Sequence, residues 1–142
     1  KTYMPLILTQ QASGLSAALT DLVEQAGHKV GFTAHVDCPS VRSGETVETL
    51  AYRTLRAGAA NIRKHPRARN VWLVCREQLG RLEVSLRDDG IGFDAETAAT
   101  FDRRLHLGLD SISERVRLAG GRFAIHSTPG EGTILSVSLP VG

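Results

Sequence analysis

Several features that mark large classes of protein are scarce or missing in this sequence. There are only two cysteines, and they form neither a CxxC pair nor a spacing typical of metal ligands. The apolar run near the start covers only residues 4–8, which is too short for a signal sequence or a membrane span. A net charge of +2 is too small to indicate a nucleic acid or an anionic membrane as a partner. These absences argue against a cysteine-ligated metal site, a membrane span and a nucleic-acid-binding role.

The cysteine usage predicts a reducing, cytoplasmic compartment. Cys75 falls inside a predicted strand, where a free thiol is most often a small buried hydrophobic group. Because Lys1 opens the chain in the middle of a pattern, we expect residues 1–142 to be a single domain cut from a longer protein. Any membrane or sensor segment of that protein is expected to lie outside the chain.

What the sequence does contain is the composition and periodicity of one globular domain. Apolar residues make up 42% and charged residues 23% of the 142 residues, as in an ordinary domain with a single core. The apolar spacing predicts helices over 13–27, 43–65 and from 110 or 111 to 119, a weak helix over 95–101, and strands over 30–36, 71–76, 81–87, 122–126 and 133–139. The polar, unpatterned segment 102–106 predicts a mobile loop. This order of elements predicts a mixed α/β sheet covered by helices on one face.

A polar residue on the apolar side of the long helix is the first candidate for a site. Asn61 follows Gly58 by three residues and lies on or beside the apolar stripe. A primary amide that faces a core must find hydrogen-bond partners or cost about 1–3 kcal/mol. Taken alone, Asn61 is best interpreted as a buried amide that caps a neighbouring loop.

The segment at residues 88–93, which follows a strand, supports two interpretations. Its glycines formally match a dinucleotide fingerprint, but the neighbouring carboxylates oppose a pyrophosphate, and the sequence has no P-loop motif. An ionised Asp88 can instead accept the exocyclic amine of adenine, while Gly90 and Gly92 let the backbone pass close to the base. An ordinary Asp-Gly turn explains the segment equally well.

Two further glycine-containing segments complete the pattern. Residues 130–133 are by themselves best interpreted as a hairpin turn. Residues 107–109 precede a predicted helix start at Asp110, whose backbone N–H groups and dipole could receive phosphate oxygens. The charge of Asp110 is unfavourable for that role unless Asp110 serves only as the helix cap.

In this order, the segments resemble the N, G1, G2 and G3 boxes of the GHKL ATPase superfamily. The boxes correspond to residues 52–65, 88–93, 106–121 and 127–133, and the likeness runs from about residue 15 to 139. The strongest resemblance is to the catalytic domain of two-component sensor histidine kinases of the nitrate-sensor and DesK-like subfamily. It implies the Bergerat fold, a two-layer α/β sandwich with a mixed, mostly antiparallel sheet, and it implies ATP and Mg²⁺ as cofactors.

The resemblance also implies a role for each candidate residue. Asn61 would hold the Mg²⁺ that bridges the phosphates, because an amide oxygen is a hard ligand suited to that ion. Lys64 and His65 would lie near the phosphate tail, and Asp88 would bind adenine. The other residues implied in ATP binding are Gly90 and Gly92 at the base, His106, Leu107, Gly108 and Leu109 at the lid and its hinge, and Gly132 and Thr133 at the far wall of the adenine pocket.

Two positions depart from the family pattern. Ala57 stands four residues before Asn61, where the N box usually has a Glu that lies beside the γ-phosphate. A methyl group cannot orient water or accept a proton, so no residue of the chain is assigned as catalytic, and ATP hydrolysis is expected to be poor while nucleotide binding survives. Leu105 stands where a glycine often precedes the His-Leu-Gly-Leu run, which bears on the flexibility of the lid.

The expected function is to present ATP–Mg²⁺ for phosphoryl transfer to a His in a dimerisation domain outside this chain. None of the five histidines is followed by the acidic residue of an acceptor motif, so the chain is not expected to phosphorylate itself. A response regulator is the expected next partner, the parent protein is expected to be a homodimer, and the fragment a monomer. Two alternatives remain, which are a nucleotide-binding regulatory module without transfer activity, supported by Ala57, and a serine kinase of the anti-sigma type.

Overall fold

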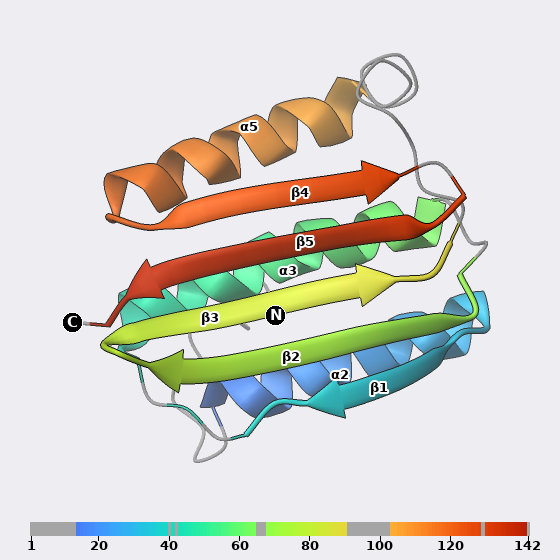
Figure 1. Cartoon of the computed structure of the whole chain (residues 1–142), viewed down its shortest axis with the longest axis horizontal. Helices are drawn as coiled ribbons and strands as arrows, with labels where there is room; N and C mark the ends of the chain where they lie inside the picture. The colour runs from blue at the N-terminus through green and yellow to red at the C-terminus, as the bar shows by residue number, and fades with distance from the viewer. Residues whose placement is uncertain are drawn as a thin grey trace, which may run out of the picture.

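The computed structural model describes residues 14–39, 41, 43–64, 68–90, 103–128 and 130–141, and for residues 61–64 and 103–109 it describes the backbone only (Figure 1). In chain order, the elements in these ranges are α2 (Gly14–Val30), β1 (Thr33–Asp37), α3 (Glu45–Lys64), β2 (Asn70–Gln78), β3 (Arg81–Asp88), α5 (Arg103–Leu118), β4 (Arg122–Thr128) and β5 (Gly132–Pro140). The predicted helix over 95–101 lies outside the described residues. Every other predicted element is present, although some boundaries differ.

The strands form a five-stranded sheet in the order β1-β2-β3-β5-β4. β1 pairs with β2 in parallel, and the remaining neighbours are antiparallel. Figure 1 shows α2 and α3 behind the sheet, while α5 packs against α3 and β4. The structure is thus a two-layer α/β sandwich with a mixed, mostly antiparallel sheet and helices on one face, as predicted.

The core lies between the helices and the inner face of the sheet. Alternation along β2, β3 and β5 places every second residue inward, and the register aligns these residues into rows, so that Leu86 lies between Leu73 on β2 and Leu135 on β5. Leu19 of α2 and Leu55 of α3 are fully buried and complete this core from the helical layer. Burial of the side chains on one face explains why a pattern of period two in the sequence was sufficient to predict these strands.

The first helix ends later than the sequence predicted. Gly27 was expected to close it, but α2 continues to Val30. The residue after the helix, Gly31, has a φ of +102° and donates its N–H to Gly27 O at 2.7 Å. Gly27 serves a different purpose, because a Cβ there would lie 2.9 Å from the carbonyl oxygen of Phe32. Two glycines near a helix end can therefore have separate roles, one for close packing and one for the positive φ.

The last helix begins earlier than predicted. Residues 103–106 were expected to form a mobile loop before a helix at Asp110 or Ser111, but α5 begins at Arg103. Arg and Leu are favourable in helices, and a Leu at position 105 avoids a penalty of about 1 kcal/mol that a glycine would carry there. His106, Leu107, Gly108 and Leu109 consequently lie within the helix.

The two cysteines form a disulfide, which corrects the expectation of a free thiol. Cys38 follows β1 and Cys75 lies on β2, with their Cα atoms 4.6 Å apart, within the usual range for a disulfide. The parallel register pairs Asp37 with Val74, so the residues that follow them, Cys38 and Cys75, lie side by side. Disulfides are rare in reducing compartments, so the cysteines no longer support the inference of such a compartment. No helix among the described residues is long and apolar enough to span a membrane.

Reduction of the disulfide should lower the thermal stability of the domain. Cys38 and Cys75 are 37 residues apart and enclose all of α3. Loop-closure entropy for a loop of this size predicts a loss of about 4 kcal/mol, which corresponds to a decrease in Tm of roughly 10 °C for a domain of this length. The measurement is a thermal melt with and without a phosphine reductant, and the Cys38→Ser variant, whose Tm should not respond to the reductant, is the control. An unchanged Tm of the reduced wild-type chain would contradict the prediction.

Candidate functional site

Several of the candidate residues lie at the end of the sheet where β3 ends and β5 begins. The register places Asp88, the last residue of β3, opposite Thr133 on β5 and Val71 on β2. The C-terminal end of α3 and the start of α5 lie toward the same end of the sheet (Figure 1). Motifs that are widely separated in the sequence are therefore brought together by strand pairing.

A glycine allows α3 to approach the sheet closely near this end. A Cβ on Gly58 would lie 3.1 Å from Leu135 Cδ1 and 3.3 Å from Leu86 Cδ2. Leu86 and Leu135 form the inward-facing pair next to Asp88 and Thr133. Asn61 lies three residues further along α3, an advance of about 4.5 Å toward the same end of the sheet. The backbone of Asn61 thus approaches the level of Asp88.

The Asp88 carboxylate is oriented by a local hydrogen bond. Gly90 N donates to Asp88 Oδ1 at 2.8 Å, which closes a turn over residues 88–90. Gly90 is buried, and a Cβ at this position would lie 2.9 Å from the same oxygen and 3.4 Å from Ala68 N. A side chain at position 90 would therefore displace either the Asp88 carboxylate or the chain at Ala68.

Gly132 makes the closest backbone approach of the site. It has a φ of +104°, and a Cβ there would lie 2.0 Å from the carbonyl oxygen of Asp88, so no larger residue fits without moving the strand. The next residue, Thr133, is only 7% exposed, and its hydroxyl lies 2.9 Å from that of Ser127 on β4. Ser127 Oγ also donates to Gly132 O at 3.3 Å. The Ser127 contacts join the start of β5 to β4, and the close approach of Gly132 sets it against the end of β3.

Asp89 takes part in the site although the sequence analysis assigned it no role. Its Oδ1 accepts hydrogen bonds from Arg69 N at 2.8 Å and Asn70 N at 2.9 Å, and its Oδ2 accepts one from Asn70 Nδ2 at 3.0 Å. Partial burial tends to raise the pKa of Asp89, but the hydrogen bonds with Asn70 and Arg69 outweigh it and hold the pKa below its usual range. The one signal in the sequence is the acidic pair at a strand end, and it does not reveal Asn70 as the partner.

The remaining candidates divide into three groups. Asn61 and Lys64 lie in the last turn of α3, one turn beyond Ala57, while His65 and Gly92 lie outside the described residues. The residues at 106–109 lie within α5. Because backbone N–H groups beyond the first turn of a helix are already bonded within it, the predicted phosphate-binding helix start at residues 110–112 is wrong. In the described part of the chain, no cluster of three or more His, Cys, Asp or Glu residues is arranged to hold a metal ion.

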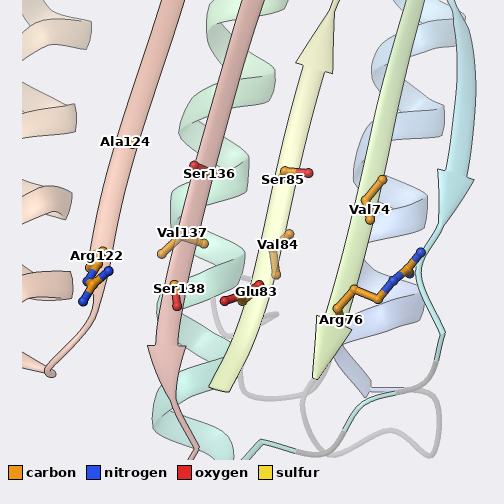
Figure 2. A pocket seen from close by; sticks show the side chains of 10 residues that line it. All are labelled: Val74, Arg76, Glu83, Val84, Ser85, Arg122, Ala124, Ser136, Val137 and Ser138. Carbon is orange, nitrogen blue, oxygen red and sulfur yellow. The ribbon is translucent and has the colours of Figure 1, made fainter. Parts of the chain in front are cut away.

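A separate hollow of about 410 Å³ lies on the other face of the sheet, away from the helices (Figure 2). Its lining residues are Val74, Arg76, Glu83, Val84, Ser85, Arg122, Ala124, Ser136, Val137 and Ser138. None of them belongs to the predicted site, and the open face carries short side chains at its centre. The meeting of motifs where β3 ends and β5 begins is therefore a stronger indication of a ligand site than this hollow.

Comparison with known proteins identifies the family. Residues 46–142 match the family described as histidine kinase-, DNA gyrase B- and HSP90-like ATPase. An uncharacterized sensor-like histidine kinase of Chloroflexus aurantiacus is 38% identical over 143 residues, which cover 96% of this chain and 24% of that protein. The sensor histidine kinase YdfH of Bacillus subtilis is 38% identical over 82 residues, which cover 57% of this chain and 20% of that protein. The chain thus spans about a quarter or less of the length of these relatives.

Solved structures share the fold. The histidine kinase domain from the blue-light activated histidine kinase EL346 of Erythrobacter litoralis superposes with a TM-score of 0.75 at 18% identity, covering 98% of this chain and 69% of that one. Full-length ShkA in complex with AMPPNP superposes with a TM-score of 0.68 at 21% identity, covering 92% of this chain and 30% of that one.

The chain belongs to the histidine kinase-, DNA gyrase B- and HSP90-like ATPase family. Its relatives are sensor histidine kinases, and the match to the Chloroflexus protein extends over almost the whole chain. The resemblance drawn from the ordered sequence motifs is thereby confirmed.

Substitution of Gly132 should be far more damaging than substitution of the neighbouring Gly130. A Cβ at position 132 would overlap the Asp88 carbonyl in addition to straining a positive φ, so Gly132→Ala should lower the free energy of unfolding by about 2–5 kcal/mol. Gly130 also has a positive φ, of +84°, but no atom of the described residues lies within 4 Å of the place that its Cβ would take, so Gly130→Ala should cost only about 1–2 kcal/mol. Urea denaturation of both variants measures the difference, and equal losses would contradict the proposed close contact.

Proposed function

We propose that this chain is the ATP-binding catalytic domain of a sensor histidine kinase, which presents ATP–Mg²⁺ for phosphoryl transfer to a His outside residues 1–142. The observation that carries this proposal is the Asp88 carboxylate, which is oriented by Gly90 N and lies where Gly132 brings β5 against the end of β3. The family membership and the names of the relatives point the same way.

The Asp88 carboxylate suits the adenine ring. An ionised carboxylate accepts the exocyclic N6 amine of adenine, whereas guanine presents a carbonyl oxygen at the equivalent position and would be repelled. A Cβ on either Gly90 or Gly132 would collide with Asp88, so both positions require glycine. We assign Gly92 to the same wall of the base pocket and Thr133 to the far wall.

The end of α3 is proposed to face the phosphates. Asn61 offers an amide oxygen, a hard ligand suited to Mg²⁺, and Lys64 and His65 supply positive charge near the phosphate tail. His106, Leu107, Gly108 and Leu109 would contribute from the first half of α5, rather than from a loop. When bound, Mg²⁺ would neutralise charge on the phosphates, and the residues of this chain would supply binding and orientation.

Ala57 limits what the domain does chemically. It lies one helical turn before Asn61, and its methyl group can neither activate water nor accept a proton. The domain therefore holds and orients ATP, and the base for transfer has to come from the domain that carries the acceptor His. This arrangement favours transfer over wasteful hydrolysis.

The proposed partners follow from this division of labour. They are a dimerisation domain with the acceptor His in the same parent protein and a response regulator that takes the phosphoryl group, with no direct role for nucleic acid. We propose a homodimeric parent and a monomeric isolated chain. We place the domain in the cytoplasm, where ATP is available.

Asp88→Ala should abolish most of the nucleotide affinity while the fold persists. Loss of a hydrogen bond to a charged group predicts a decrease of about 10–100-fold in affinity for a non-hydrolysable ATP analogue. The measurement is calorimetric titration of wild type and variant, with and without Mg²⁺, with a GTP analogue as the control for base selectivity. Glu83→Ala removes a carboxylate on the open face of the sheet and should leave the affinity unchanged. Wild-type affinity in Asp88→Ala would refute the assignment of the base pocket.

Phosphoryl transfer should survive with Ala57 in place. Incubation of the chain with γ-labelled ATP and Mg²⁺ should leave the chain itself unlabelled, while addition of the parent's dimerisation domain should give an acid-labile phosphohistidine on that domain. The control is the Asp88→Ala variant, which should not support labelling. ATP binding without any transfer to the dimerisation domain would favour the alternative, a nucleotide-binding regulatory module, for which Ala57 is the supporting observation.

A further inference from the structure

Asp89 and Asn70 connect the two segments of chain that meet beside Asp88. The Asp89 carboxylate accepts three hydrogen bonds from residues 69–70, two from backbone N–H groups and one from the Asn70 amide, at distances of 2.8–3.0 Å. In return, Asp89 N donates to Asn70 O at 3.2 Å. We call this set of bonds between Asp89 and residues 69–70 the Asp89 clamp.

The clamp lies between the two parts of the proposed nucleotide site. Residues 69–70 come after α3, the helix that carries Asn61 and Lys64, and Asn70 is the first residue of β2. Asp89 stands between Asp88 and Gly90. The same two segments touch at a second point, because a Cβ on Gly90 would lie 3.4 Å from Ala68 N. These contacts hold the turn that follows Asp88 against the chain at the start of β2.

A histidine on β1 fixes the orientation of the Asn70 amide. His35 Nε2 lies 2.8 Å from Asn70 Oδ1, which leaves the Asn70 NH₂ group directed to Asp89 Oδ2. His35 in turn stacks on Trp72, with ring centroids 5.3 Å apart and planes inclined by 16°. The amide is thus held from one side by β1 and binds the clamp carboxylate on the other.

We infer that Asp89 and Asn70 are positioning residues for nucleotide recognition, an assignment that rests on the proposed function. Both oxygens of Asp89 accept hydrogen bonds from residues 69–70, and the proposed function assigns adenine to the neighbouring Asp88. The clamp holds the turn over residues 88–90 against the chain that leaves α3. Without it, the turn whose Gly90 N orients the Asp88 carboxylate is no longer held against the start of β2.

An exchange of the two side chains tests this assignment. In Asp89→Asn, the Asn70 amide faces a second NH₂ group, and in Asn70→Asp, two carboxylates face each other. In the double variant Asn70→Asp/Asp89→Asn, the amide of residue 89 can accept from the backbone N–H groups and donate to the carboxylate of residue 70, which can also still accept from His35. The hydrogen-bond pattern is restored with the two groups reversed.

The readout is the affinity for a non-hydrolysable ATP analogue and for the matching GTP analogue, measured by calorimetry well below the Tm of every variant. Each single variant should bind the ATP analogue about 5–30-fold more weakly, with a smaller change for the GTP analogue, and the double variant should return to within about threefold of wild type. Asp37→Asn, which changes an exposed carboxylate on β1 that is paired with Arg76 on β2, is the charge-matched control and should bind as wild type. A purely structural role would lower the Tm without changing the base selectivity of the folded protein.

The outcomes separate this inference from the proposed function. Wild-type affinity in both single variants would overturn the role of the clamp while leaving the proposed function in place. The same holds if the loss of binding free energy in the double variant equals the sum of the losses in the two single variants. No binding by the wild-type chain would overturn both. If a single variant does not fold, Asn70→Ala, which removes only the amide and keeps the backbone bonds to Asp89, should still lower the affinity for the ATP analogue about threefold, and an unchanged affinity would count against the clamp.

Discussion

The close approach of Gly132 to the Asp88 carbonyl is the constraint on which the site depends. A Cβ at position 132 would lie 2.0 Å from that oxygen, so β5 can begin beside the end of β3 only with a glycine there. This pairing places Thr133 opposite Asp88 and starts the register that continues through Leu86 and Leu135 into the core. The same contact that aligns the central strands therefore also determines where the Asp88 carboxylate lies.

The other segments of the site reach the end of the sheet where β3 ends and β5 begins, each through a different interaction. Gly58 lets α3 approach Leu86 and Leu135 closely, which carries the backbone of Asn61 toward the strand ends. The carboxylate of Asp89 joins the start of β2 to the turn after β3 by charge-assisted hydrogen bonds. Local backbone turns, close packing at glycine and ionic hydrogen bonds thus act together at one end of an otherwise regular sheet.

Where the sequence predictions were wrong, two of the three errors came from missing three-dimensional information and one from an underestimated helix propensity. Gly27 was taken as a helix end, because a packing requirement against Phe32 cannot be distinguished from a need for positive φ in one sequence. Residues 103–106 are polar enough to suggest a loop, yet their helix propensity prevails in α5. Cys38 and Cys75 become neighbours only through the parallel register of β1 and β2, which spacing along the chain does not reveal.

The amino-acid sequence by itself determined the order of helices and strands, the inward-facing residues of the strands and the family, because periodicity and ordered motifs are local properties that need no knowledge of contacts. It also singled out Asp88, Gly90, Gly132 and Thr133, which the structure brings together where β3 ends and β5 begins. The tertiary structure alone decided the register, the disulfide and the bond between Asp89 and Asn70. These features depend on pairs of residues far apart in the chain, whose contacts are set by how the strands align and not by the spacing of residues along the sequence.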